Sequence, residues 1–234
     1  MVIYDLHMHS RQSIGENSTE EMAQMAKRLG IDGIGVCRFF GTKADLVWEI
    51  PADDIDFVKV IILKPKTAGE LEKLAAAVRN NAEVVAVYGG NYDINRAACE
   101  NSMVDVLFHP ELGRNDSGLD HICARAAAEN NVAIEINFRE IAESYKKHRA
   151  YVLSFIRRNI RLCQKYGVPV ITTSGAHTKW GLRSGRELAA VSHLLGIELS
   201  ASLETVSAVP EAIVSENRKK LGGKKWEGVS IVGE

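Results

Sequence analysis

The sequence lacks several features that would assign it at once to a particular class of protein. No apolar run approaches the ~20 residues that a membrane-spanning helix needs, and Asp5 and His7 come before any signal-like apolar segment develops. The four cysteines are far apart and form no CxxC pair, so neither a zinc ribbon nor a disulfide framework is indicated. We therefore expect a cytoplasmic protein without a membrane segment, whose reduced thiols pack as small core side chains.

A large excess of charge of one sign is also absent, because the formal net charge is −1. The chain as a whole is therefore no polybasic nucleic-acid binder, and any RNA contact must come from a local basic patch. No low-complexity block or Pro/Gly/Ser linker divides the 234 residues, so we expect a single domain over residues 1–217. Composition turns basic and glycine-rich after that, and residues 218–234 are expected to form a basic, mobile C-terminal tail.

Short apolar runs alternate with longer amphipathic segments along the whole chain. The expected strands are 2–4, 33–37, 57–63, 83–88, 104–108, 132–136, 168–172 and 198–200. The expected helices are 18–29, 67–80, 94–99, 118–130, 145–166, 184–195 and 203–217. This alternation predicts an α/β fold with a parallel sheet, either closed into a TIM-like (β/α)8 barrel or open and doubly wound. The count of eight strands favours the barrel.

Polar residues with metal-binding chemistry follow several of these strands. In a barrel, the residues after each strand gather at the carboxyl-terminal end, where function is found. Two imidazoles two positions apart, as in His7 and His9, are a plausible start for a metal site. The other candidate ligands at this end are His109, Glu135 and His177. Taken singly, each histidine is more often a hydrogen-bonded structural residue, and buried Glu135 needs a partner such as Arg139 or a histidine.

Basic residues offer candidate phosphate contacts in two regions. The long polar loop 109–121 carries Arg114 and is expected to open a helix at residues 116–118, which would make an anion site, although a plain N-cap beside a surface arginine fits equally well. Arg157, Arg158 and Arg161 form a basic stripe on the helix expected at 145–166, although such stripes are more often solvated faces. Arg139 and Lys179 follow the sixth and seventh expected strands.

Several of these motifs resemble those of the polymerase-and-histidinol-phosphatase (PHP) barrels, which are metal-dependent phosphoesterases. The matching segments are Asp5-Leu-His-Met-His9, His109-Pro110, Glu135-Ile-Asn137 and Ser174-Gly-Ala-His177. The resemblance implies a PHP-type single-domain barrel in which His7, His9, His109, His177 and, less closely, Glu135 occupy ligand positions. The acidic positions of the family are replaced by Cys37-Arg38, Leu63-Lys64 and Gly175. Because phosphoesterase sites need carboxylates to hold and bridge their ions, the cluster is interpreted as vestigial.

A second resemblance covers most of the chain and is strongest over residues 94–180. Ile94-Asn-Arg-Ala-Ala98, the loop 109–121, Ala133-Ile-Glu-Ile-Asn-Phe138, Phe155-Ile-Arg-Arg-Asn159 and Pro169-Val-Ile-Thr-Thr-Ser174 are similar to archaeal ribonuclease P protein component 3. The opening His7-x-His9 departs from many members. A free-standing PHP-type phosphoesterase remains the alternative.

The resemblance to component 3 implies a subunit of the endoribonuclease that removes 5′ leaders from precursor tRNA. The RNA subunit would carry catalysis with its own divalent metal ions, so the isolated chain is expected to have no catalytic residues. The implied partners are ribonuclease P RNA, precursor tRNA, protein component 2 in a heterotetramer, and the other protein components. The expected RNA or assembly contacts are Arg114, Arg139, Arg157, Arg158, Arg161 and Lys179. A residual metal ion at the histidines is a further expectation.

Overall fold

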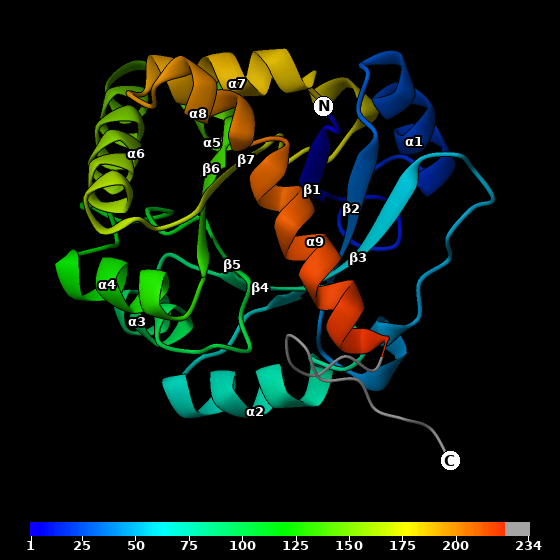
Figure 1. Cartoon of the computed structure of the whole chain (residues 1–234), viewed down its shortest axis with the longest axis horizontal. Coiled ribbons are helices and arrows are strands. Elements are labelled where there is room, and N and C mark those ends of the chain that lie inside the picture. The colour runs from blue at the N-terminus through cyan, green and yellow to red at the C-terminus, as the bar shows by residue number, and fades with distance from the viewer. Residues whose placement is uncertain (223–234) are drawn as a thin grey trace.

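A parallel sheet of seven strands forms the centre of the computed structural model, which describes residues 1–222 (Figure 1). The strands follow one another in chain order and in space. They are β1 (Tyr4–Met8), β2 (Gly33–Phe39), β3 (Asp56–Leu63), β4 (Val84–Tyr88), β5 (Val106–Phe108), β6 (Ala133–Asn137) and β7 (Val170–Thr173). An isolated bridge joins Met8, at the end of β1, to Ala176, just after β7. The sheet is therefore a nearly closed barrel, which confirms the expected TIM-like fold.

The eighth expected strand, at residues 198–200, is wrong. Glu198 is instead the N-cap of a short helix, α8 (Leu199–Glu204), and its side chain accepts a 2.8 Å hydrogen bond from the Ser200 amide. The gap between β7 and β1 is closed by the loop that follows. Thr172 N donates to Thr205 O at 3.0 Å, and Tyr4 N donates to Val206 O at 2.9 Å. A non-strand segment thus satisfies the edge groups that an eighth strand would have paired.

Helices surround the barrel, as in other (β/α) folds (Figure 1). They are α1 (Thr19–Arg28), α2 (Ala68–Val78), α3 (Tyr92–Cys99), α4 (His121–Glu129), α5 (Phe138–Glu143), α6 (Lys146–Tyr166), α7 (Gly185–Leu194), α8 and α9 (Ala208–Leu221), with 3₁₀ turns η1 (Lys43–Leu46) and η2 (Lys179–Gly181). Several begin where capping chemistry requires it. Ser18 and Glu21 form a complete capping box at α1, as do Ser184 and Glu187 at α7. The expected start of α4 at residues 116–118 is wrong, because Asp120 is the cap that accepts bonds from the amides of residues 122 and 123.

The last helix closes the amino-terminal end of the barrel. Ile213 and Val214 of α9 pack in the same cluster as inward-facing strand residues such as Leu6, Val60 and Phe108. The Arg218 guanidinium donates to both carboxylate oxygens of Asp56, at 2.7 and 2.8 Å. In Figure 1, α9 accordingly lies across the front of the barrel.

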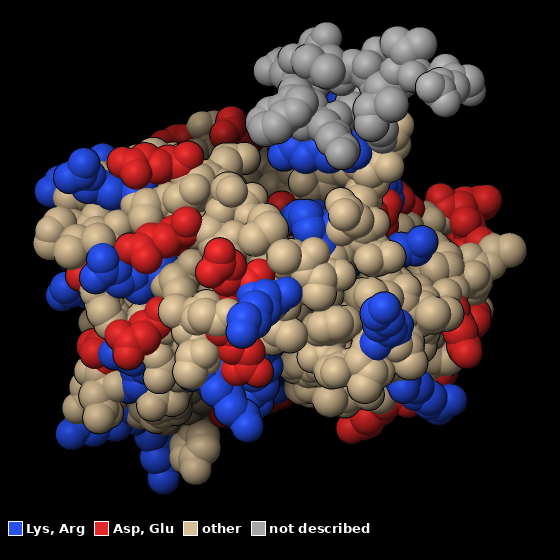
Figure 2. Space-filling view, turned by 90° about the horizontal axis from the view of Figure 1, so that it is seen from below, with Lys and Arg blue, Asp and Glu red and all other residues tan. Residues whose placement is uncertain are grey.

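The expected division at residue 218 falls inside α9. The part of the expected basic tail at residues 223–234 lies outside the described residues. Within residues 1–222, none of the helices has the length and apolar character needed to cross a bilayer. The four cysteines are buried and unpaired. On the face seen from the α2 side, Lys and Arg side chains alternate with Asp and Glu over the part that Figure 2 shows uncovered.

Candidate functional site

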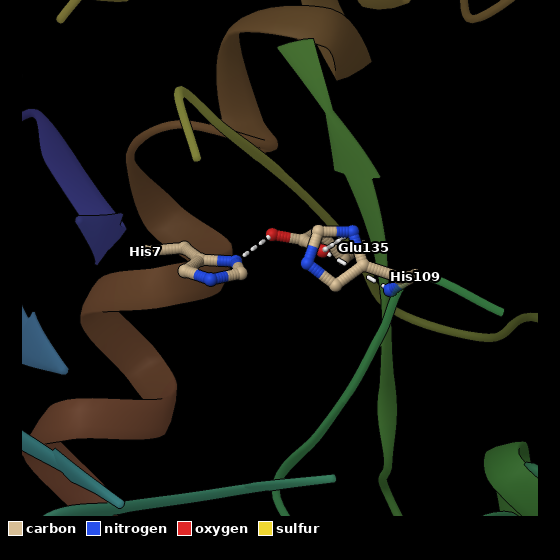
Figure 3. Close-up of side chains that lie close together, drawn as sticks. All are labelled: His7, His109 and Glu135. Carbon is tan, nitrogen blue, oxygen red and sulfur yellow. Dashed lines mark hydrogen bonds and ion pairs between the residues drawn. The ribbon is translucent and has the colours of Figure 1, made fainter. Parts of the chain in front are cut away.

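The structure brings the four predicted histidines and Glu135 together at the carboxyl-terminal end of the barrel. The ring centroids of His7 and His9 lie 5.2 Å apart, those of His7 and His109 5.1 Å apart, and those of His9 and His177 4.9 Å apart. We call these five residues the histidine cluster. His7 lies within β1 and points into the barrel, where its ring stacks on Phe108 at 3.9 Å. In Figure 3 the His7 ring points at the Glu135 carboxylate, and the His109 ring lies next to that carboxylate.

Glu135 is the acceptor on which this arrangement depends. Its carboxylate, fully buried in β6, accepts hydrogen bonds from His7 Nδ1 (2.6 Å), Thr173 Oγ1 (2.5 Å), Asn137 Nδ2 (3.1 Å) and the His109 amide (3.2 Å). Burial raises the pKa of Glu135, while the neighbouring His109, Thr173 and Asn137 lower it. Because four donors surround this carboxylate, Glu135 can keep its negative charge although it is buried.

The remaining hydrogen bonds fix a single pattern of protons. Because His7 Nδ1 donates to Glu135, its Nε2 is bare and can accept from His9 Nε2, which lies 3.2 Å away. His9 Nδ1 then accepts from the Ser13 hydroxyl at 3.1 Å. Burial lowers the pKa of His9 to about 2, lowers that of His109 to about 3, and holds the pKa of His7 well below its usual range. All three rings are therefore neutral at physiological pH.

Neutral rings can bind a metal ion as well as form hydrogen bonds, and at His9 this requires the proton on Nε2 to move to Nδ1. Two ring nitrogens bound to one tetrahedral zinc ion lie about 3.3 Å apart, since each bond is ~2.0–2.1 Å; the two Nε2 atoms of His7 and His9 are 3.2 Å apart. His109 Nδ1 is buried without a hydrogen-bond partner within residues 1–222 and lies 3.7 Å from both Glu135 Oε2 and Glu140 Oε1. His7, His109 and Glu135 present ligand atoms within 4.8 Å of one another. The donor set therefore fits one nitrogen-bound ion.

The same end of the barrel does not fit a carboxylate-bridged pair of ions. Both oxygens of Glu135 are already engaged by donors, and the side chains at the other acidic positions of PHP barrels are not acidic. At Gly175, with φ +63°, an added Cβ would lie 2.4 Å from Asn137 Oδ1, so a side chain there would require Asn137 to move. Lys64 projects its ammonium over the ring of Tyr88 at 4.9 Å. Asn137 therefore fills the space that an aspartate at position 175 would need.

Two acidic residues of this region were missed in the sequence. Glu140, on α5, is held beside the cluster because α5 is capped by the Asn137 side chain. Burial raises the pKa of Glu140, and it raises that of buried Glu111 to about 8, so Glu111 is protonated at neutral pH. Glu111 lies in the segment after the fifth strand but was not chosen as a ligand, and Glu140 lies on a separate helix, which strand-end position does not identify. The only available indication was the local run His109-Pro110-Glu111, whose histidine adopts a left-handed φ of +51°.

Three of the predicted phosphate contacts are paired with carboxylates. Arg114 forms a two-point ion pair with Asp116, at 2.6 and 2.8 Å, so it does not lie free at a helix N-terminus. Arg139 contacts Glu140 and Glu143 on its own helix, at 3.3 and 3.1 Å. Lys179 contacts Glu21 on α1 at 3.0 Å. An RNA phosphate would have to compete with these carboxylates or join them.

The other three lie together on the outer face of α6. Val152, Ile156 and Ile160 bury one side of this helix, and Arg157, Arg158 and Arg161 lie exposed on the other. Within residues 1–222, no carboxylate lies within ion-pair distance of any of the three. Arg158 also lines a groove of about 430 Å³ between α6 and residues 115–120. The predicted basic stripe, which we call the α6 stripe, is therefore present and unpaired.

The loop that forms the other wall of this groove is held in one conformation. The buried Asn95 amide donates to the carbonyls of Pro110 (2.8 Å) and Gly118 (2.9 Å). Gly118 has φ +73°, and a Cβ there would lie 1.8 Å from the Pro110 carbonyl oxygen, so only glycine fits. A buried asparagine and an obligatory glycine thus fix the groove before any ligand binds.

Comparison with known proteins gives consistent matches over the whole chain. The family model of RNase P subunit p30 matches residues 2–221. Ribonuclease P protein component 3 of Methanococcoides burtonii is 37% identical over 230 residues, covering 97% of this chain and 93% of that protein. The same component of Methanosarcina barkeri is 34% identical over 232 residues, covering 99% and 96%.

Solved structures give the same picture. A chain in the cryo-EM structure of archaeal ribonuclease P with mature tRNA matches with a TM-score of 0.78 and 26% identity, over 97% of this chain and 98% of that one. Histidinol phosphate phosphatase of Lactococcus lactis, solved with zinc, L-histidinol and phosphate, matches with a TM-score of 0.50 and 12% identity, over 92% and 93%. The second match concerns the fold alone.

Proposed function

This chain belongs to the RNase P subunit p30 family, and from that premise we propose that it is a protein subunit of archaeal ribonuclease P. In this role it supports the removal of 5′ leaders from precursor tRNA, while the RNA subunit and its divalent ions carry out the cleavage. The observation that carries the proposal is the full-length similarity to component 3 of two methanogens. The side chains of the histidine cluster do not suit a carboxylate-bridged pair of ions, because both oxygens of Glu135 are engaged by donors and position 175 is a glycine, and this supports catalysis by the RNA subunit.

The α6 stripe is the part of the surface best suited to RNA phosphates. Arg157, Arg158 and Arg161 are exposed and unpaired within residues 1–222, so an approaching phosphate displaces no internal ion pair. Arg114, Arg139 and Lys179 are weaker candidates, because each must share a carboxylate partner. Phosphate contacts of this kind position a protein on RNA without reading its bases.

Partners are proposed from the same family membership. The chain is expected to assemble with component 2 as a heterotetramer, with the other protein components, with ribonuclease P RNA and, in the holoenzyme, with precursor tRNA. The compartment expected for this assembly is the cytoplasm.

Reconstitution tests this function. Ribonuclease P RNA and the other protein components are assembled with and without this chain, and cleavage of precursor tRNA is measured across a range of salt concentrations. Replacing Arg157, Arg158 and Arg161 together by alanine should weaken assembly and reduce the salt slope by about one for each phosphate that is no longer neutralised. Lys73→Ala, on the mixed-charge α2 face, is the control and should change neither. If adding this chain improves neither assembly nor cleavage over buffer alone, the proposal is refuted.

A second candidate property rests on the two facing nitrogens of His7 and His9. We propose that the histidine cluster holds one zinc-type ion in a structural role, with His7, His9 and His109 or His177 as ligands. Elemental analysis of the purified chain should then give one ion per chain, and His9→Ala should abolish it. His148→Ala, on the surface of α6, is the control. A phosphodiester-cleaving activity that His7→Ala removes would instead favour the free-standing phosphoesterase.

A further inference from the structure

The turn η2 exposes an aromatic ring that the proposed function does not use. Trp180 is 71% exposed, and within residues 1–222 its indole N–H has no hydrogen-bond acceptor. Trp48 provides the contrast, because it is half-buried and donates its indole N–H to Val36 O at 2.9 Å. Internal packing therefore explains a tryptophan at position 48 and not at position 180.

The backbone that carries Trp180 is held from three sides. The Lys179 amide donates to Asn17 Oδ1 at 2.9 Å, and the Lys179 ammonium contacts Glu21 at 3.0 Å. The Arg183 guanidinium donates to the Trp180 carbonyl at 2.9 Å and lies 4.8 Å from the Phe138 ring. An aromatic side chain on a fixed turn loses little conformational freedom on binding. The ring is thus presented to solvent in advance of any ligand.

The charge around this turn points to an anionic ligand. Residues 144–186 contain ten lysines and arginines and no aspartate or glutamate, although the whole chain has a net charge of −1. The Lys179 ammonium lies 5.5 Å from the Trp180 ring centroid, and Arg183 and Arg186 follow in the same segment. Lys179 is already paired with Glu21, so the positive charge in residues 179–186 that has no ion-pair partner within residues 1–222 is on Arg183 and Arg186.

The surroundings of Trp180 favour RNA over a protein partner. A protein partner is recognised by a contiguous apolar patch, whereas the apolar residues next to Trp180 in this segment, Ala176 and Leu182, are buried. A single exposed aromatic ring beside basic residues suits RNA instead, because a base can stack on the ring while the basic residues neutralise the phosphates. We propose that Trp180 stacks on an unpaired base of the RNA bound by this chain, with Lys179, Arg183 and Arg186 near the flanking phosphates. This proposal rests on the RNA-binding function proposed above.

The test compares Trp180→Ala with Trp180→Phe. The probe is ribonuclease P RNA of the source organism, and the full-length chain is titrated onto it in the presence of the other protein components. Trp180→Ala should weaken binding about 5- to 150-fold, the range for removal of one base–aromatic stack, while Trp180→Phe should stay within a few-fold of wild type. The slope of log Kd against log salt should not change, because stacking neutralises no phosphate. Leu194→Ala, which removes an equally exposed apolar side chain on α7, is the control.

Chemical probing of the RNA provides the second measurement. One or a few unpaired nucleotides should be protected by wild-type protein and reactive with Trp180→Ala, whose melting temperature should match that of wild type. If wild type binds and Trp180→Ala binds equally well with the same protection, the stacking role is wrong and the subunit function stands. If wild type itself does not bind the RNA, the subunit function fails and the stacking role fails with it.

Discussion

Replacing Glu135 by glutamine removes the charge from the side chain on which the histidine cluster depends, while it keeps the shape of that side chain. Three of its four donors, from His7, Thr173 and Asn137, point at Oε1, and the His109 amide points at Oε2. A glutamine must place its NH₂ group at one of these two positions. The less costly choice places the NH₂ group opposite the His109 amide. Two N–H groups then face each other, and one buried donor loses its acceptor.

The magnitude follows from these four hydrogen bonds. A buried donor without an acceptor costs about 1–3 kcal/mol, and each of the three remaining bonds weakens by about 1 kcal/mol when its acceptor is neutral. Part of this cost is offset, because the neutral glutamine avoids the cost of burying a charge, the same desolvation that raises the pKa of Glu135. We therefore expect Glu135→Gln to lower the free energy of unfolding by about 2–4 kcal/mol.

Urea denaturation followed by circular dichroism at pH 7.5 measures this difference. Glu143→Gln is the matched control, because Glu143 contacts Arg139 from an exposed position on α5 and should change stability by less than about 0.5 kcal/mol. Repeating the wild-type titration with a chelator separates the two roles of the cluster, since a structural ion would make wild type less stable without it. A Glu135→Gln protein within about 0.5 kcal/mol of wild type would refute the idea that this carboxylate is charged and bonded as described.

Three further predictions concern other parts of the molecule. Gly175→Asp, which restores the acidic residue of PHP barrels, should destabilise the fold by about 3 kcal/mol, because the residue has a left-handed φ and the new side chain clashes with Asn137. Gly30→Asp is the control, because Gly30 has a similar φ and open space around it, and it should cost only about 1 kcal/mol. Thermal denaturation measures both. Asn95→Ala should free the loop 109–121, which hydrogen exchange would detect as faster exchange at residues 110–118 with the β4 amides still protected. Hydrogen bonding to Arg218 holds the pKa of Asp56 below 3.8, so the pair stabilises the fold above that pH and this stabilisation is lost as the pH falls. Arg218→Met should therefore be less stable than wild type at pH 7 and equally stable near pH 2. A difference in stability that stays constant with pH would contradict this assignment.

Much of the fold could be predicted because apolar strands and amphipathic helices alternate so regularly. The expected strands overlap all seven that are observed, but the first was placed at 2–4 and lies at Tyr4–Met8. Asp5 and His7 interrupt the apolar run and yet are buried in the strand. Asp5 Oδ1 accepts from the Ser174 amide and His7 Nδ1 donates to Glu135, and no local pattern could supply those partners. The eighth strand was wrongly expected at 198–200, because the Glu198 side chain caps the helix α8 there.

The residues of the candidate site could be predicted from the sequence more fully than the contacts they make. Strand-end position identified the four histidines, because parallel strands bring their carboxyl ends to one place. It could not show that Asn137 occupies the space beside Gly175, or that Glu140 approaches His109 from a separate helix. The pairing of Arg114 with Asp116 was equally hidden, since both residues lie in a loop whose shape depends on Asn95.

The closure of the barrel by the loop at residues 205–206 sets the order in which a nascent chain can finish folding. The first strand is joined to the residue after β7 by the bond from the Ser174 amide to Asp5, 169 positions apart, and to the closing loop by the bond from Tyr4 N to Val206 O. Until that last segment leaves the ribosome, β1 and β7 are unprotected edges that can pair with other chains. The interval before residues 205–206 and α9 emerge is therefore the one in which β1 and β7 are most exposed to pairing with other chains.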